Sequence, residues 1–390
     1  MIYAGIDVAK DKHDCFIVNS DGVILFEPFV ITNNHDGFSD LFSKLNSCSE
    51  DLNMLKVGLE ATGHYSDNLL EFLSSKGLAT IVINPLHTSL FRKGLSLRKT
   101  KTDRIEANSI ATMLKTETIK PYSQSSYQNR ELKSLTRYRF SLVQDLAKLK
   151  TSYSRLCVIL FPELEKIVSS LHLVSVYALL TEFPTAKAIA SCHLTKLKNL
   201  LSKASKGCFD KGMAIEIRDA AKLSIGSYSD VKALELQQTI QRITVLERQI
   251  DDVEAKINPI IDSMKSPIMT VPGISYRMAA MIVAETENFA NFTHAEQILA
   301  FAGLEPSVYQ SGQLTSTHAK MVKRGSKYLR YAIFNATKYV CHWDPHFKAY
   351  LAKKRAEGKP YNVAVSHAAK KLVRVLFHLV KTNQIFVGQS

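Results

Sequence analysis

Four acidic side chains stand where short segments of regular structure are expected to end or begin. Asp7 and Glu60 each close an apolar run that is typical of a buried strand, and Asp103 and Glu106 open an amphipathic helix. Because Asp103 and Glu106 are three residues apart, they share one face of that helix. Carboxylates that converge from different elements can neutralise two divalent ions and leave coordination sites for phosphate and water. The four residues therefore predict a site for Mg²⁺ or Mn²⁺ that supports phosphoryl chemistry.

The same residues have structural alternatives. Asp-x-x-Glu at a helix start is also a capping box with Asp103 as the cap, and an acid at a strand tip is also a turn former. Asp7 and Glu60 favour the metal site, because an unpaired carboxylate directly after an apolar strand is costly to bury.

Basic residues gather in two stretches of the chain. Residues 92–104 contain six basic residues and one acidic residue, and residues 318–381 contain fifteen against two, a net charge of +13 within a formal total of +14. Such charge draws a surface to polyanions, so nucleic acid is the first partner to consider, with a solvated basic face as the alternative. The candidate contacts are Arg98, Lys99, Lys101, Arg104, Lys320, Lys323, Arg324, Lys327 and Arg330.

A tight turn, Val271-Pro272-Gly273-Ile274, leads into an apolar helix near the start of the C-terminal region. It is similar to a helix-hairpin-helix, in which backbone N–H groups of Gly273 and its neighbours meet a phosphate. An ordinary Pro-Gly turn is the alternative.

The elements that must position the acids follow an α/β pattern over residues 1–123. The turn Asp21-Gly22 indicates a hairpin between the second and third strands, and residues 92–104 are expected to form a polar loop. Strands are predicted at 2–8, 13–19, 22–29, 55–61 and 79–83, and helices at 36–46, 65–76 and 103–115.

Residues 124–265 show helical periodicity, with two apolar stripes that approximate heptads. One stripe runs from Leu135 to Leu156 and the other from Leu236 to Ile260, so two long helices are expected, paired within the chain or between subunits. A small helical insertion is predicted between them, with breakers at Pro162, Pro184 and Gly207. Residues 266–390 form a basic, helical C-terminal region.

Cysteine usage and hydropathy indicate the cellular compartment in which the protein is expected. The six cysteines are scattered without a Cys-x-x-Cys pair, which argues against a zinc site or a disulfide framework. The apolar run 171–180 is far shorter than the roughly 20 residues that cross a bilayer. A soluble, cytoplasmic protein is expected.

Several motifs occur in series along the chain and together resemble one family. They are GIDVAKDKHD, GLEATGHY and RKTKTDRIEA in the first third, and VPGIS, FAGLEP, QSG and KRGSKYLR in the last third. This series looks like the DEDD transposases of bacterial insertion sequences, the insertion-sequence one-ten family. These are recombinases directed by a bridge RNA, and the family includes the Piv-type invertases.

The resemblance implies a fold and a set of partners. It implies an RNase H or RuvC-like α/β domain over residues 1–123, a helical coiled-coil region with a small insertion over 124–265, and a C-terminal helical transposase domain with a helix-hairpin-helix-like turn over 266–390. The implied partners are DNA, both element ends and target, a guide RNA and further copies of the chain in a homodimer or homotetramer.

The resemblance also assigns the catalytic residues. The family's four acidic positions fall on Asp7, Glu60, Asp103 and Glu106, with glutamate at the last position where the family usually has aspartate. The nucleophilic serine falls on Ser311, which would attack a DNA phosphodiester and hold the strand covalently while the metal site assists. The expected activity is excision and insertion of an insertion sequence by a DNA transposase.

Two other functions fit parts of the pattern. A metal-dependent nuclease of the Holliday-junction type needs the carboxylates and not Ser311, and a non-catalytic DNA- or RNA-binding protein needs only the basic surface. Sugar kinases and actin-like ATPases also begin with a Gly-Ile-Asp strand. Their phosphate loop requires glycine and a small hydroxyl residue next, where this chain has Val8, Ala9 and Lys10.

Overall fold

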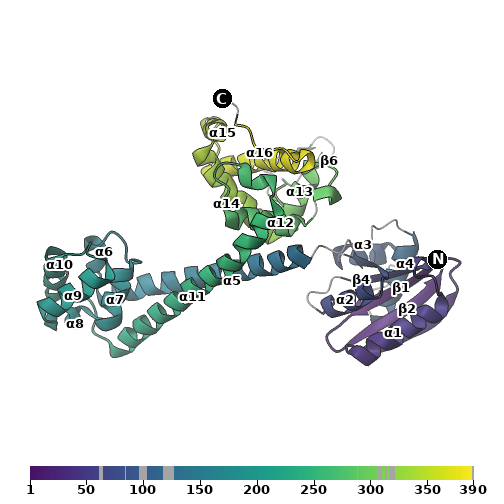
Figure 1. Cartoon of the computed structure of the whole chain (residues 1–390), viewed down its shortest axis with the longest axis horizontal. Helices are drawn as coiled ribbons and strands as arrows, with labels where there is room; N and C mark the ends of the chain where they lie inside the picture. The colour runs from purple at the N-terminus through teal and green to yellow at the C-terminus, as the bar shows by residue number, and fades with distance from the viewer. Residues whose placement is uncertain are drawn as a thin grey trace. The chain divides into compact units, whose positions relative to one another are not determined.

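The computed structural model describes residues 1–60, 65–83, 85–95, 103–116, 127–287, 289–305, 310–311, 314–315 and 321–388. Its contacts form two compact units, Met1–Gln124 and Ser125–Ser390, whose elements are labelled in Figure 1. The first unit is mixed α/β, and the described part of the second is helical apart from one short hairpin. The division into three domains at residues 123 and 265 stays a prediction.

The first unit is built on one five-stranded sheet with the strand order β3-β2-β1-β4-β5. Strand β2 is antiparallel to both of its neighbours, whereas β1, β4 and β5 run parallel. Helices α1 and α2 contribute to the core on one face of the sheet, and α4 to the core on the other. The elements are β1 (Ile2–Val8), β2 (Lys12–Asn19), β3 (Ile24–Thr32), α1 (His35–Cys48), η1 (Leu52–Met54), β4 (Leu55–Glu60), α2 (Asp67–Ser75), β5 (Ala79–Ile83), α3 (Pro85–Leu95) and α4 (Asp103–Thr116).

The alternation of side chains along each strand decides which face of the sheet they occupy. Ala4, Ile6 and Val8 of β1 belong to the core beneath α1 and α2. The odd-numbered residues of β1, Asp7 among them, therefore face α4. On β4 the odd-numbered residues belong to the same core as Ile6, which leaves Glu60 on the α4 face.

The structure confirms the predicted mixed α/β pattern of this unit and corrects two boundaries. Residues 85–95 form helix α3, so the expected polar loop does not begin at residue 92. Pro85 is the first helical residue, a position that favours proline because its missing N–H has no partner within the helix. Strand β3 continues to Thr32, beyond the predicted end at residue 29.

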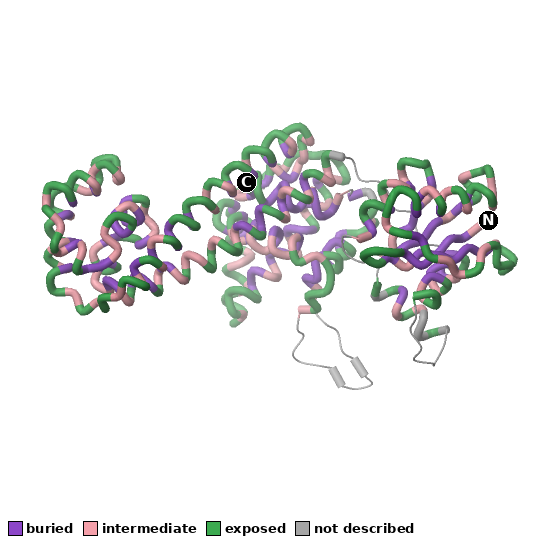
Figure 2. Tube along the Cα trace, turned by 90° about the horizontal axis from the view of Figure 1, so that it is seen from below, coloured by how far each residue is buried: buried purple, intermediate pink, exposed green. Residues whose placement is uncertain are grey.

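Two long helices, α5 (Tyr127–Leu160) and α11 (Asp230–Met264), pack along each other in the second unit. Buried positions recur along both of them (Figure 2). Ile243 and Ile250 of the predicted stripe are 0% and 8% exposed within the single chain. These two stripe residues therefore serve packing within the chain, and they are not left free for a second subunit.

A helical insertion joins the distal ends of α5 and α11, as predicted. Its core includes Tyr153 of α5, whose hydroxyl donates a hydrogen bond to the Leu171 carbonyl oxygen at 2.9 Å. The predicted breakers Pro162, Pro184 and Gly207 all lie between helices. The helices are α6 (Leu164–Ile167), α7 (Val174–Glu182), α8 (Ala186–Ser191), α9 (Leu194–Ala204) and α10 (Lys211–Lys222).

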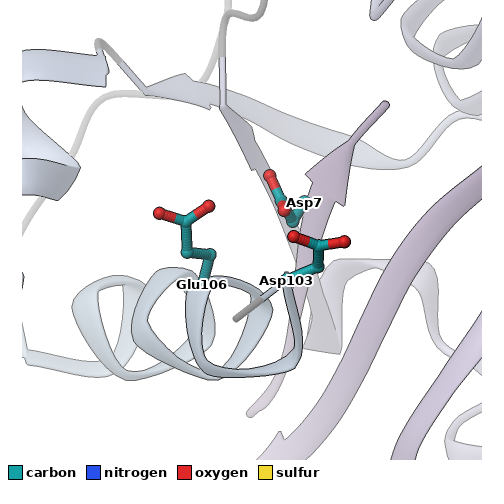
Figure 3. Close-up of side chains that lie close together, drawn as sticks. All are labelled: Asp7, Asp103 and Glu106. Atoms are coloured by element: carbon teal, nitrogen blue, oxygen red, sulfur yellow. The ribbon is translucent and has the colours of Figure 1, made fainter. Parts of the chain in front are cut away.

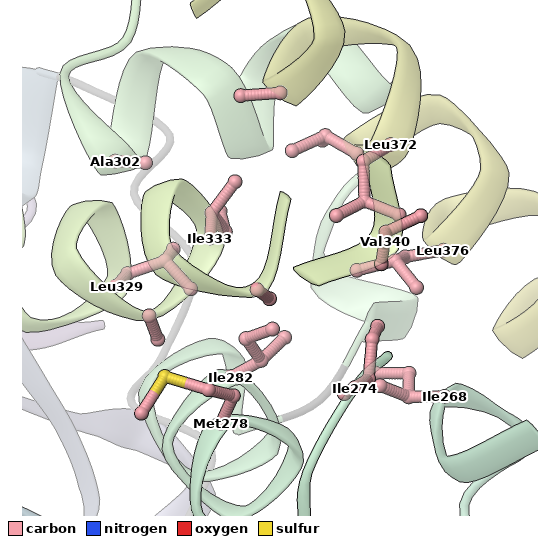
Figure 4. Packing of buried hydrophobic residues seen from close by; sticks show 14 of the residues in the cluster. Ile268, Ile274, Met278, Ile282, Ala302, Leu329, Ile333, Val340, Leu372 and Leu376 are labelled. Atoms are coloured by element: carbon pink, nitrogen blue, oxygen red, sulfur yellow. The ribbon is translucent and has the colours of Figure 1, made fainter. Parts of the chain in front are cut away.

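The C-terminal helices share a separate apolar core (Figure 4). Met278 and Ile282 of α12 pack with Leu329 and Ile333 of α14, and Leu372 of α16 belongs to the same cluster. No helix in the described part of the chain is both long and apolar enough to cross a membrane. The elements are η2 (Pro267–Thr270), α12 (Tyr276–Thr286), η3 (Phe289–Asn291), α13 (Ala295–Ala302), β6 (Gln310–Ser311), β7 (Leu314–Thr315), α14 (Lys327–Trp343), α15 (Pro345–Ala356) and α16 (Tyr361–Thr382).

Candidate functional site

Three of the four predicted acids come together in the first unit. Asp7 projects from the end of β1, and Asp103 and Glu106 project toward it from the first turn of α4 (Figure 3). One carboxylate oxygen of each lies within 4.8 Å of the other two. Oxygen ligands sit at about 2.0 to 2.6 Å from Mg²⁺ or Ca²⁺, so ligands on opposite sides of an ion are about 4 to 5 Å apart. The three carboxylates are thus close enough to share one divalent cation.

A close approach of β1 to α4 brings these side chains together. A Cβ atom on Gly5 would lie 2.1 Å from the Ala107 carbonyl oxygen and 2.5 Å from the Ala111 nitrogen. Only glycine lets the two backbones meet at this distance. The contact fixes the start of α4, and with it Asp103, beside the end of β1.

The fourth acid, Glu60, lies on the same face of the sheet as Asp7. It is one residue beyond the last parallel pair between β1 and β4, Ile6 with Leu59. Its Oε2 accepts a hydrogen bond of 2.8 Å from the Thr88 hydroxyl of α3. Glu60 therefore borders the group of three and is held by Thr88. Thr88 was not predicted, because residues 85–95 were not expected to form a helix.

Burial and the neighbouring acids raise the proton affinity of Asp7. The pKa of the Asp7 carboxyl is raised to about 7, first by burial and then by the negative charges of Glu106, Asp103, Glu60 and Asp14. Such a shift means that a positive charge at this point would be favourable. A proton supplies that charge at low pH, and a divalent cation would supply it at neutral pH.

The raised pKa of Asp7 predicts how the stability of the metal-free protein depends on pH. The unfolded chain releases this proton near pH 4 and the folded chain near pH 7, so the stability that protonated Asp7 contributes is lost as pH rises between these values. In EDTA, calorimetry should show the melting temperature of the first unit falling more from pH 5 to pH 8 in the wild type than in Asp7→Asn. Mg²⁺ should reverse the fall at pH 8. Parallel pH profiles for the two proteins would contradict the coupling of these acids.

The predicted serine lies in the second unit. Ser311 is in β6, where its backbone pairs with Leu314 of β7, and its side chain is not among those that the structure describes. The candidate nucleic-acid contacts Arg98, Lys99, Lys101 and Lys320 lie outside the described residues.

Of the described basic candidates, four are exposed and the fifth is hydrogen-bonded to the backbone. Arg104, Lys323, Arg324 and Lys327 are exposed. Arg330 donates from Nη1 to the carbonyl oxygens of Ala302 at 2.8 Å and Lys323 at 3.2 Å. Arg330 therefore holds the loop before α14 against the end of α13, and a contact with phosphate can only be an addition to that role.

Gly273 has a packing reason for being glycine. Its φ is +90°, and a Cβ atom there would lie 2.6 Å from the Tyr339 carbonyl carbon of α14. The turn therefore needs glycine to pack against α14. Its predicted contact with phosphate stays a prediction.

A buried carboxylate that the sequence reasoning missed anchors the start of α14. Glu285 of α12, 2% exposed, accepts hydrogen bonds from Arg137 Nε at 2.6 Å and from the Ser326 hydroxyl at 2.6 Å. Ser326 is also the N-cap of α14 and accepts from the Leu329 N–H. An acid at the end of the apolar run 278–284 was the available signal. Glu285 thus joins α5, α12 and the start of α14 through one buried group of hydrogen bonds.

Removal of Glu285 is expected to destabilise the second unit. Glu285→Ala leaves the Arg137 guanidinium and Ser326 without their partner, which costs about 3 kcal/mol, the low end of the range for broken buried pairs, since Arg137 is 42% exposed. Trp343 is the one tryptophan of the chain and lies in α14, so its fluorescence during urea unfolding reports this unit. Glu247→Ala, which removes a half-exposed pair with Lys150, should cost about 1 kcal/mol or less. Equal losses in the two variants would contradict the role of Glu285.

Comparison with known proteins adds the family. Residues 4–162 match a family model for transposases of the DEDD IS110 type, and residues 265–352 match the model described as "Transposase IS116/IS110/IS902 family". The chain is similar to the IS900 uncharacterized 42 kDa protein of Mycobacterium paratuberculosis, with 24% identity across 99% of this chain and 97% of that protein. It is also similar to the pilin gene-inverting protein of Moraxella bovis, with 22% identity across 98% of this chain and 97% of that protein. Family models match both the N-terminal and the C-terminal regions, and the relatives align along nearly the whole chain. The chain therefore belongs to the IS110 family of DEDD transposases.

Proposed function

We propose that this transposase cleaves and rejoins DNA through a covalent bond to Ser311, assisted by a divalent metal at Asp7, Asp103, Glu106 and Glu60. The observation that carries the metal site is the meeting of three carboxylates within 4.8 Å. The mixed sheet, with acids at the ends of two adjacent parallel strands and on the helix that covers them, supports an RNase H or RuvC-like assignment for the first unit. When bound, Mg²⁺ or Mn²⁺ would stabilise the negative charge that develops on the reacting phosphate.

The serine step is a transesterification. The Ser311 oxygen forms a bond to phosphorus, the bond from phosphorus to one DNA oxygen breaks, and the serine proton is transferred so that the released oxygen becomes a hydroxyl. A hydroxyl of another strand reverses the step and regenerates the serine. Because one phosphodiester is exchanged for another, strands can be rejoined without a further energy source.

A serine hydroxyl is a weak nucleophile until a base, a metal or a positive environment activates it. The exposed cations Lys323, Arg324 and Lys327 follow Ser311 closely in the chain. They supply positive charge for the phosphate in this proposal.

The partners are also part of the proposal. DNA supplies the element ends and the target, a bridge RNA directs the choice of target, and the chain works as a homodimer or homotetramer. A monomer mass by light scattering in the presence of DNA would contradict the assembly. RNase treatment that leaves recombination unchanged would contradict the guide.

The experiment that tests the function uses purified protein, its co-purified RNA and labelled DNA that carries the element ends. With Mg²⁺, joined products are expected. Free ends alone would favour a hydrolytic nuclease, the alternative that uses the acids and not Ser311. Binding without any effect of metal, weakening steeply with salt, would favour a non-catalytic binding protein.

A further inference from the structure

A cleft of about 600 Å³ lies between α14 and the start of α16. Lys327, Tyr331 and Phe334 line it from one face of α14, and Asn362 lines it from the first turn of α16. Sites for small organic ligands typically occupy about 300 to 1,000 Å³. The described lining of the cleft includes none of the proposed catalytic residues, and it shares Lys323 and Lys327 with the cations proposed above for the phosphate.

The charge of the cleft favours an anion. Its described lining contains the cations Lys323, Lys327 and Arg330 and no acidic residue. Helix α16 adds to this potential, because its first turn has no acidic residue and its N-cap, Pro360, offers no side-chain acceptor for the first N–H groups. Unpaired N–H groups at a helix start attract phosphate.

Two aromatic side chains line the cleft. Tyr331 and Phe334 are half-buried, and the Phe334 ring has the Lys338 ammonium at 5.0 Å from its centroid. Nucleobases stack on aromatic rings of this kind with little dependence on sequence. A base that is paired within a duplex has no free face to offer, so stacking here requires an unpaired base.

Amide groups border the same space. The Asn335 Nδ2 donates to the Tyr331 carbonyl oxygen at 2.9 Å, which leaves its Oδ1 as an acceptor. The side-chain amide of Asn362 has no hydrogen-bond partner among the residues that the structure describes. Asparagine amides can pair with the edge of a base, so the cleft combines a phosphate site, a stacking surface and an edge contact.

We propose that this cleft holds one unpaired nucleotide of the nucleic acid on which the transposase acts. The base stacks on Phe334 and Tyr331, the phosphate meets Lys323 and Lys327, and Asn362 contacts the base edge. The inference rests on the proposed function, because an enzyme that exchanges strands must hold nucleotides that have left the duplex.

The test uses the full chain in EDTA and fluorescein-labelled single strands of mixed sequence that contain 5-iodouracil, one of DNA and one of RNA. Phe334→Leu keeps apolar bulk and removes the ring. It should weaken single-strand binding by about fivefold to tenfold in fluorescence anisotropy and leave binding of a matched DNA duplex within about twofold. Photo-crosslinks in the wild type should map to the peptide with Tyr331 and Phe334 and be lost in the variant. The strand, DNA or RNA, that shows the larger loss identifies the source of the nucleotide.

Phe301→Leu is the matched control, because Phe301 is 40% exposed on α13 and does not line the cleft. Its binding should equal that of the wild type. Trp343 fluorescence checks folding in each variant. If Phe334→Leu does not fold, Asn362→Ala, at an exposed position, should show a loss restricted to single strands.

Crosslinks that map elsewhere, together with unchanged single-strand affinity in folded Phe334→Leu and Asn362→Ala, would overturn the cleft proposal. In that case a wild type that still recombines element ends would keep the proposed function. The opposite result is that crosslinks map to the cleft while the wild type never recombines element ends. That result would overturn the proposed function, and the cleft would still be a nucleotide site.

Discussion

Asp7→Asn is expected to abolish recombination while the fold and the affinity for nucleic acid stay nearly unchanged. Asp7 is the one member of the acid group on β1, and it faces Asp103 and Glu106 of α4. Asparagine has nearly the same size and lacks the charge that a divalent ion requires. Changing a residue that only hydrogen-bonds to a metal ligand typically lowers metal affinity or activity by about 10- to 100-fold. Loss of a ligand itself should therefore lower activity by more than about a hundredfold.

The loss cannot be attributed to unfolding. The raised pKa of Asp7 shows that its charge is unfavourable in the metal-free fold, so the neutral asparagine should stabilise the first unit at pH 8 in EDTA. The measurement is recombination of labelled element ends in Mg²⁺, beside binding of the same DNA in EDTA and the melting temperature.

Three further variants sharpen the assignment of the metal site. Glu60→Gln should lower recombination strongly. Glu106→Asp, which introduces the residue that the family resemblance implies at this position, should be tolerated with a changed preference between Mg²⁺ and Mn²⁺. Asp36→Asn is the matched control, because the Asp36 side chain is 96% exposed at the start of α1, and it should behave as the wild type. Full activity in Asp7→Asn would rule out the metal site.

The first unit was largely predictable because its signals are local. The strands 2–8 and 79–83 have the predicted bounds, since short apolar runs with clear breakers specify buried strands. Once β1 and β4 pair in parallel with Ile6 opposite Leu59, alternation of side chains places Asp7 and Glu60 at one edge and on one face. The helix that carries Asp103 followed from its apolar periodicity.

What could not be predicted depends on contacts between distant segments. Gly5 reads as an ordinary strand residue, and its need for the Ala107 backbone appears only when α4 lies on the sheet. The heptad stripes predict that two helices will pair but do not specify the partner, and Ile243 turns out to be buried within its own chain. The hydrogen bond from Thr88 to Glu60 is likewise a tertiary contact without a local signal. For Glu285 the apolar run before it was a local signal, but its partners Arg137 and Ser326 are distant in the sequence.

Gly273 illustrates a residue whose type can have two reasons, a predicted contact with phosphate and an observed packing contact. The Pro-Gly turn suggested an open backbone for phosphate, whereas the positive φ and the approach to Tyr339 show a turn packed on α14. A glycine can satisfy both demands, and a sequence cannot separate them.

Ser311→Ala is expected to eliminate strand exchange and the covalent adduct while DNA binding persists. Alanine removes the one oxygen that could bond to phosphorus and changes nothing in the acids of the first unit. The backbone pairing of Ser311 with Leu314 needs no side chain, so the hairpin should form in the variant. Activity should fall to the background of the assay, because a transesterification without its nucleophile has no substitute step.

The measurement is label that stays on the protein after denaturation. Wild type, RNA, Mg²⁺ and 5′- or 3′-labelled element ends should give a protein–DNA adduct, and digestion should place it on the peptide that contains Ser311. Two nearby hydroxyl residues, Thr315 and Ser326, are controls of different kinds. Thr315→Val lies on the partner strand β7 and should keep the adduct, whereas Ser326→Ala removes the N-cap of α14 and should lower stability with the adduct site unchanged.

The two catalytic variants separate the roles of the two units. If the metal assists attack by the serine, Asp7→Asn and Ser311→Ala should both lack the adduct, and mixing the two proteins should restore it only where serine and acids act in different subunits of one assembly. If Ser311→Ala recombines normally, the serine mechanism is wrong and the carboxylates alone must direct hydrolysis and joining. If Ser311→Ala instead releases free DNA ends in Mg²⁺, the acids activate water by themselves, and the serine is what turns a nuclease into an enzyme that rejoins strands.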